Sequence, residues 1–146
     1  MKVVVQRVSS AQVTIDAKVV GKISRGLMIL IGITHDDTQA DADKLVSKLI
    51  NLRLFPSEKS EFDFSIIDTR AEVLVVSQFT LYGSTAKGRR PDFFDAAKPE
   101  IAKPLCDYFV EQLRQNDVKV ETGVFGADMQ VELVNDGPVT LIIESK

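Results

Sequence analysis

The apolar run GLMILIGIT, residues 26–34, constrains the fold more than any other stretch of the chain. A strand that is apolar at every position is buried on both faces, so other elements must cover both sides of its sheet. Residues 73–76, Val-Leu-Val-Val, repeat this character. A chain of 146 residues with 45% hydrophobic residues is long enough for one domain, residues 1–146, with a sizeable core.

The other segments alternate between strand and helix patterns. Residues 1–16 and 18–24 are rich in Val, Thr and Ile and predict a hairpin. Helical spacing follows Asp36, Asp37 and Thr38, which are three candidate N-caps, and a second helix is predicted over 101–116. Strands are predicted over residues 73–82, 118–123, 129–136 and 139–145, with Asn-Asp-Gly-Pro as a turn before the last of them. The pattern predicts an α+β fold of about seven strands and two main helices.

Composition narrows the class of protein. The formal charge of −3 and the pI of about 5.2 argue against a generally basic nucleic-acid coat, although a local basic patch remains compatible with them. A single cysteine, Cys106, excludes an intrachain disulfide and a cysteine-rich zinc site. No stretch approaches the ~18 apolar residues of a membrane span, and the N-terminal apolar run is too short for a signal peptide. We therefore expect a cytoplasmic protein without a membrane partner.

Polar residues interrupt the predicted strand over 73–82. Ser77, Gln78 and Thr80 each cost free energy when buried without a partner, so they are satisfied by neighbouring backbone or they face a binding cavity. In a regular strand Ser77 and Phe79 share one face, and Gln78 and Thr80 share the other. A strand that ended near residue 79 and bent would instead direct the backbone N–H groups of Phe79 and Thr80 toward a ligand.

Two later segments are further candidates. In NDGPVT, residues 135–140, the Gly137–Pro138 pair forms either a common hairpin turn or a rigid backbone recognition element. In GVFGADMQ, residues 123–130, Phe125 and Met129 either wall a pocket or fill the core.

The segment KGRRPDFF, residues 87–94, is the one dense basic patch. Lys87, Arg89 and Arg90 are either solvated in a loop or in contact with phosphate groups. No P-loop, dinucleotide-binding glycine motif or cluster of metal ligands is visible, so no cofactor and no metal are predicted. His35 has no local partners for a catalytic triad and is read as a surface or capping residue, and Cys106 is read as a buried structural thiol.

SQFTLYG at residues 77–83, then GRRPDF, then NDGPVT resemble, in this order, the D-aminoacyl-tRNA deacylase family. The resemblance covers essentially the whole chain. It implies a homodimeric fold with a barrel-like, mostly antiparallel sheet. It also implies hydrolysis of the ester that joins a D-amino acid to the 3′-terminal ribose of tRNA. The expected partner is tRNA carrying a D-amino acid or glycine.

The resemblance also implies roles for individual residues. Residues 77–80 line the pocket, with Thr80 and the backbone N–H of Phe79 at the reacting ester. Gly137 and Pro138, joined by a cis bond in the family, reach into the pocket of the other subunit and block L-amino acids. The 2′-hydroxyl of the tRNA assists catalysis. Three alternatives remain open: Thr80 as a protein nucleophile, a non-catalytic module that binds RNA ends, and a conventional esterase.

Overall fold

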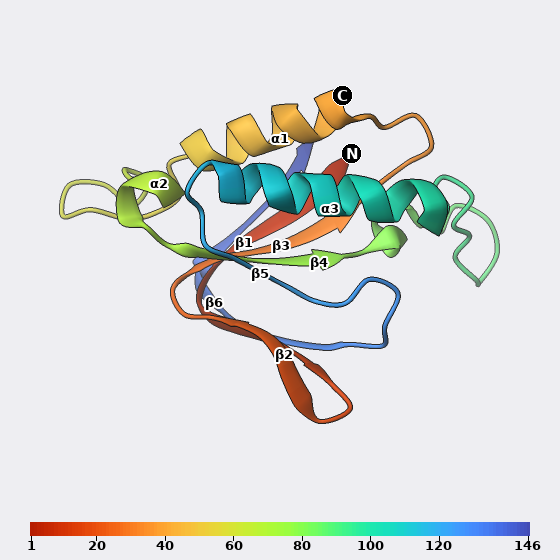
Figure 1. The fold of residues 1–146 in the computed structure, drawn as a ribbon, viewed down its shortest axis with the longest axis horizontal. Helices are drawn as coiled ribbons and strands as arrows, with labels where there is room; N and C mark the ends of the chain where they lie inside the picture. Colours follow the sequence, from red (N-terminus) through yellow and green to blue (C-terminus); the bar gives the residue numbers. More distant parts are fainter.

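The computed structural model describes residues 1–146 and shows one curved sheet of six strands with helices packed on one side (Figure 1). The strands run in the order β2–β1–β3–β4–β5, and β6 pairs with β1. Their bounds are β1 Lys2–Ile15, β2 Lys18–Ile23, β3 Gly26–Gly32, β4 Glu72–Ser77, β5 Val120–Thr122 and β6 Gln130–Glu144. The first four predicted strands are thus present, the fourth of them shorter than expected.

Strand β1 organises the sheet because it is long enough to pair with three others. It pairs antiparallel with β2, β3 and β6, whereas β3–β4 and β4–β5 are parallel. The β1–β2 turn has Asp16 and Ala17 at φ of 48° and 61°, the left-handed pair that matches the twist of a two-residue hairpin. The predicted hairpin is confirmed.

The sheet curls far enough for β2 to approach β5, which gives the barrel-like shape. A Cβ on Gly21 of β2 would lie 2.5 Å from the carbonyl oxygen of Thr122 in β5, so only a glycine permits this approach. The inside of the curl holds its own apolar cluster: Val8, Ala11, Val13, Ile23, Met28, Leu74 and Val76. The both-face burial expected for β3 follows, because this cluster covers one face of the sheet and the helices cover the other.

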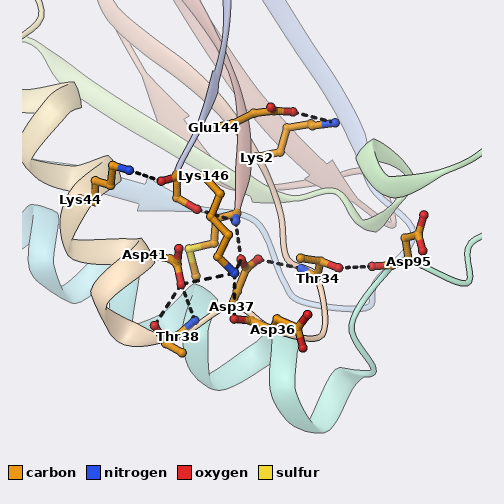
Figure 2. Close-up of polar contacts among 12 residues, drawn as sticks. Lys2, Thr34, Asp36, Asp37, Thr38, Asp41, Lys44, Asp95, Glu144 and Lys146 are labelled. Atoms are coloured by element: carbon orange, nitrogen blue, oxygen red, sulfur yellow. Dashed lines mark hydrogen bonds and ion pairs between the residues drawn. The ribbon is translucent and has the colours of Figure 1, made fainter.

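The two main helices are α1, Gln39–Asn51, and α3, Pro99–Gln115, and they lie side by side over the outer face of the sheet (Figure 1). Both predicted helices are confirmed. Thr38 is the N-cap of α1, and its N–H donates to the Asp41 carboxylate at 2.9 Å. Asp37, another candidate cap, is instead buried and accepts hydrogen bonds from the Thr34 N–H and the Met1 amino group (Figure 2).

The short helix α2, Ile66–Thr69, lies between α1 and β4. Two predictions of local structure were wrong. The strand predicted over 73–82 ends at Ser77 and is followed by a 3-10 turn, η1, Phe79–Tyr82. The turn expected at residues 135–138 is an irregularity inside β6, which pairs with β1 on both sides of it, so the sheet has six strands rather than seven. None of the helices is both long enough and apolar enough to cross a bilayer.

Candidate functional site

The candidate site begins where β4 leaves the sheet. β4 runs parallel to β3 up to the pair Ile31–Ser77, and the Gln78 N–H donates the last bond to the Ile31 carbonyl at 2.7 Å. The chain then tightens into η1, which packs over the end of β3. Gly32 permits this packing, because a Cβ there would lie 3.0 Å from the Leu81 Cβ.

The change from strand to 3-10 turn alters which side chains meet. The alternation expected of a regular strand would separate Ser77 and Phe79 from Gln78 on opposite faces. The structure does not have this alternation, because Ser77, Gln78 and Phe79 all line one cavity. The alternative reading, a strand that ends and bends before residue 79, is the one the structure has.

Two backbone donors lie at the start of η1. The first backbone bond of the turn runs from the Leu81 N–H to the Gln78 carbonyl at 3.2 Å. The amides of Phe79 and Thr80 precede this bond and therefore have no acceptor within the turn. Phe79 is more than half exposed and its side chain lines the cavity. Neighbouring backbone N–H groups without an acceptor are the kind of donor that can bind an oxyanion.

The cavity has a volume of about 620 Å³ and is lined mainly by apolar side chains. It lies at the carboxyl ends of β3 and β4, beneath the start of α3 and beside the segment that precedes β6. Both residues singled out in that segment, Phe125 and Met129, line it. The predicted residues that the structure brings together are therefore Ser77, Gln78, Phe79, Phe125 and Met129.

Thr80 stands beside this set rather than in the cavity wall. Its Oγ1 accepts a hydrogen bond from the Gln78 Nε2 at 2.5 Å, and the side chain is exposed. An amide nitrogen donates and has no basicity with which to take a proton. The hydroxyl therefore has no activating base as its hydrogen-bond partner.

Three residues of the cavity wall that carry an aromatic ring, a carboxylate or a thiol were missed as site residues. Phe93 packs edge-on against Phe79, with ring centroids 5.0 Å apart. Asp128 supplies the one carboxylate of the lining and is exposed. Cys106 was expected to be a buried thiol, and it is, but it also borders the cavity; burial raises its pKa to about 12. Phe93 and Asp128 lie in two candidate segments, residues 87–94 and 123–130, but only the tertiary fold shows that their side chains face the cavity.

Gly137 and Pro138 lie in the irregular part of β6 and do not line the cavity of their own chain. Their peptide bond is cis, and Gly137 has a φ of 135°. The guanidinium of Arg7, itself only 2% exposed, holds this segment: its Nε donates to the Asp136 carbonyl at 3.1 Å, and it also pairs with the Glu61 carboxylate. Arg7 was not predicted as a functional residue; its signal was a cation that interrupts the apolar run of the first strand.

The basic segment forms an exposed loop closed by the bridge between Ser84 and Asp92. Lys87, Arg89 and Arg90 are exposed, and none of them takes part in an ion pair. His35 is exposed as expected, and its Nε2 lies 2.7 Å from the Phe94 carbonyl oxygen. No three His, Cys, Asp or Glu side chains gather in a way that could hold a metal ion.

Comparison with known proteins gives one consistent family. A family model described as D-Tyr-tRNA(Tyr) deacylase matches residues 4–144. D-aminoacyl-tRNA deacylases from Thermosipho melanesiensis and Bacillus mycoides are 52% and 53% identical over 100% of this chain and 98% and 100% of their own.

Two solved structures share the fold over nearly their whole length. One, titled c-Myc DNA Unwinding Element Binding Protein, is 43% identical with a TM-score of 0.93, and the match covers 100% of this chain and 99% of that one. The other, titled as a probable eukaryotic D-amino acid tRNA deacylase, is 20% identical with a TM-score of 0.83 and covers 98% of each chain. At that identity the second likeness concerns the fold alone.

Proposed function

Because the chain belongs to the D-Tyr-tRNA(Tyr) deacylase family, we propose that it hydrolyses the ester of D-aminoacyl-tRNA and releases free D-amino acid and tRNA. The observation that carries the chemistry is a cavity bordered by η1, whose Phe79 and Thr80 N–H groups have no acceptor within the turn, together with the lack of a base bonded to Thr80. The reaction belongs in the cytoplasm, where tRNA is charged.

The substrate supplies the activating group for hydrolysis that the protein lacks. An aminoacyl ester is already activated, and the terminal ribose carries a 2′-hydroxyl next to the esterified oxygen. In our proposal the N–H groups of Phe79 and Thr80 stabilise the oxyanion that forms as water adds to the ester carbonyl. The 2′-hydroxyl assists the proton transfer to the departing ribose oxygen, and orientation in the cavity supplies the rest of the rate. Ser77 and Gln78 help to hold the amino acid.

The test separates substrate assistance from a protein nucleophile. Thr80→Ala retains the Thr80 backbone N–H but removes the hydroxyl, so it is expected to keep substantial activity, whereas a D-aminoacyl ester on a tRNA ending in 2′-deoxyadenosine is expected to be nearly inert. Single-turnover deacylation of both substrates by wild type and variant measures this. Activity lost in Thr80→Ala but kept on the deoxy substrate would instead identify Thr80 as the nucleophile.

Selection of the D-form involves a second copy of the chain. In this proposal Gly137 and Pro138 of one subunit project into the cavity of the other and occupy the direction of an L side chain. Exposed apolar side chains on β6 support an interface on that strand: Val131, Val134 and Ile142. A pocket that fixes the amino group and the ester then admits a D side chain, which points elsewhere, and refuses an L side chain by exclusion.

Selection by exclusion alone predicts a specific result for glycyl-tRNA. Glycine has a hydrogen in both directions, and a site that only removes clashes has no means to reject it. We therefore expect D-aminoacyl-tRNA and glycyl-tRNA to be cleaved and L-aminoacyl-tRNA to be spared. Deacylation of D-, L- and glycyl esters on one tRNA, with sedimentation velocity to establish the dimer, is the experiment. If the D-ester is cleaved while the glycyl ester survives, the pocket reads the D side chain directly.

Contact with the RNA is assigned to the exposed cations of the loop after η1, Lys87, Arg89 and Arg90. Their lack of intramolecular ion pairs leaves them available to phosphates despite the negative net charge. Two other functions predict different results in the same assay. A module that only binds RNA ends would not turn over at catalytic protein concentrations, and a conventional esterase would cleave small esters without tRNA.

A further inference from the structure

Phe94 is the most exposed large apolar side chain of the protein, at 84% of its accessible surface. Its neighbour Phe93 points the other way, into the cavity wall against Phe79. Of the two adjacent rings, that of Phe93 lines the cavity and that of Phe94 is exposed to solvent. An aromatic ring left this open has no role in the core.

The backbone around Phe94 is held in place by hydrogen bonds. Residues Phe93–Ala96 form a turn closed by the bond from the Ala96 N–H to the Phe93 carbonyl at 3.1 Å. The Phe94 carbonyl oxygen lies 2.7 Å from the His35 Nε2. The Asp95 carbonyl accepts from the Thr34 Oγ1 at 2.6 Å (Figure 2). Because the backbone that follows the ring is tied to Thr34 and His35, just past the end of β3, little further ordering of this backbone is needed when a ligand stacks on the ring.

The position of the ring is between two parts of the proposed site. Phe93 and Ala96, which flank the turn, both line the cavity. The bridge between Ser84 and Asp92, two residues before Phe94, closes the loop that carries the three cations. A single strand whose 3′ end enters the cavity and whose phosphates reach the cationic loop therefore has to leave the cavity near this turn.

We propose that Phe94 is a stacking platform for an unpaired base of the tRNA 3′ end, one or two nucleotides before the terminal adenosine. The proposal rests on the function proposed above and adds a contact outside the cavity. Bases of single-stranded RNA stack on exposed aromatic side chains, and the stacking surface is present on every base, so the contact adds affinity without sequence preference. Loss of one such contact weakens binding by about 5- to 150-fold.

Binding of an uncharged acceptor-stem hairpin with an unpaired CCA end tests the contact independently of catalysis. Phe94→Ala is expected to weaken its binding within the range above, and Phe94→Tyr is expected to restore it because the ring face remains. Ile67→Ala, which truncates an exposed apolar residue on α2, is the matched control and is expected to bind like wild type. Circular dichroism and sedimentation velocity establish that all three variants keep the fold and the assembly state of wild type.

A double-substitution cycle identifies the partner of the ring. The second probe is the same hairpin with abasic nucleotides at the two positions before the terminal adenosine. If Phe94 stacks on one of these bases, the abasic probe and Phe94→Ala each weaken binding, and their combination weakens it no further. Additive losses would place the ring against something other than these bases, and unchanged binding of Phe94→Ala to the intact hairpin would overturn the proposal.

Kinetics distinguishes the failure of this contact from the failure of the proposed function. With D-aminoacyl-tRNA, Phe94→Ala is expected to raise KM by the same factor and leave kcat unchanged, whereas D-aminoacyl-adenosine, which has no preceding nucleotides, is cleaved equally by both proteins. Equal losses on the two substrates would overturn the proposal. So would a change of assembly state in Phe94→Ala, because it would show that a second copy of the chain covers the ring. Wild-type protein inert on both substrates would refute the function, while the hairpin assay would still decide on Phe94.

Discussion

Replacing Arg7 by methionine tests how the Gly137 segment is held in place. The Arg7 side chain is buried, and its guanidinium donates to the carbonyl oxygens of Asp136 and Leu54, at 3.1 and 2.8 Å, and pairs with the Glu61 carboxylate. Methionine occupies a similar volume but has no donor, so these two carbonyl groups lose their partner, and the Glu61 carbonyl loses a weaker one at 3.4 Å.

The magnitude follows from these groups. A buried acceptor left without a donor costs about 1–3 kcal/mol, which gives about 2–6 kcal/mol for the two carbonyls. The Glu61 side chain is 59% exposed and is rehydrated, and the methionine gains apolar contacts, so we expect the lower half of this range, about 2–4 kcal/mol. For a domain of this size that lowers Tm by roughly 4–16 °C. Arg7→Lys keeps the charge but lacks the several N–H donors of the planar guanidinium, so an intermediate loss of stability is expected.

The assay combines urea unfolding with deacylation of D- and L-esters. The Arg7 Nη2 lies 3.3 Å from where a Cβ on Gly137 would be, so removal of the guanidinium frees the segment proposed to exclude L side chains. Arg7→Met is therefore expected to lose D-over-L discrimination as well as stability. Lys2→Met is the control on the same strand: its pair with Glu144 is partly exposed and contributes less than about 1 kcal/mol. An Arg7→Met protein as stable as the Lys2 control, with unchanged discrimination, would refute the reasoning.

Three further changes test other parts of the structure. Gly32→Ala places a Cβ 3.0 Å from the Leu81 Cβ and shifts η1, so kcat/KM for deacylation is expected to fall by about 10- to 100-fold with a loss of stability of only about 1–3 kcal/mol; activity equal to wild type would show that η1 tolerates the shift. Because the pKa of Cys106 is about 12 in the folded protein and about 8.5 when unfolded, the thiol favours folding below pH 8.5, and this contribution is lost as the pH rises toward 12. In urea unfolding, Cys106→Ala is expected to remove the part of the stability loss at alkaline pH that comes from ionisation of the thiol. The native thiol is expected to resist alkylation at pH 8, and rapid modification would contradict its burial. Replacing the three cations of the loop, Lys87, Arg89 and Arg90, by glutamine is expected to weaken tRNA binding and to reduce its dependence on salt. An unchanged dependence on salt would show that the RNA binds elsewhere on the protein.

The elements determined by local pattern were predictable from the sequence. The helical spacing after Thr38 and the apolar run of β3 depend on side-chain period alone, and a period defines which face is buried whatever packs against it. The hairpin after β1 is likewise local, because its two turn residues connect strands that are adjacent in the chain. The ordered set of short motifs pointed to the family in the same way, since each motif is contiguous.

The tertiary structure decided where these elements stop and what they meet. β4 ends at Ser77 because its partner β3 reaches Gly32 and the chain turns over that glycine, a contact between residues that are about 50 positions apart. β6 continues through the Gly-Pro segment because β1 is long enough to pair on both sides of it, so a sequence typical of a turn lies within a strand. The cavity collects side chains from η1, from the loop before α3 and from the segment before β6. Turn propensity and side-chain period describe near neighbours, whereas these outcomes depend on pairing across the sheet, which only the packed fold defines.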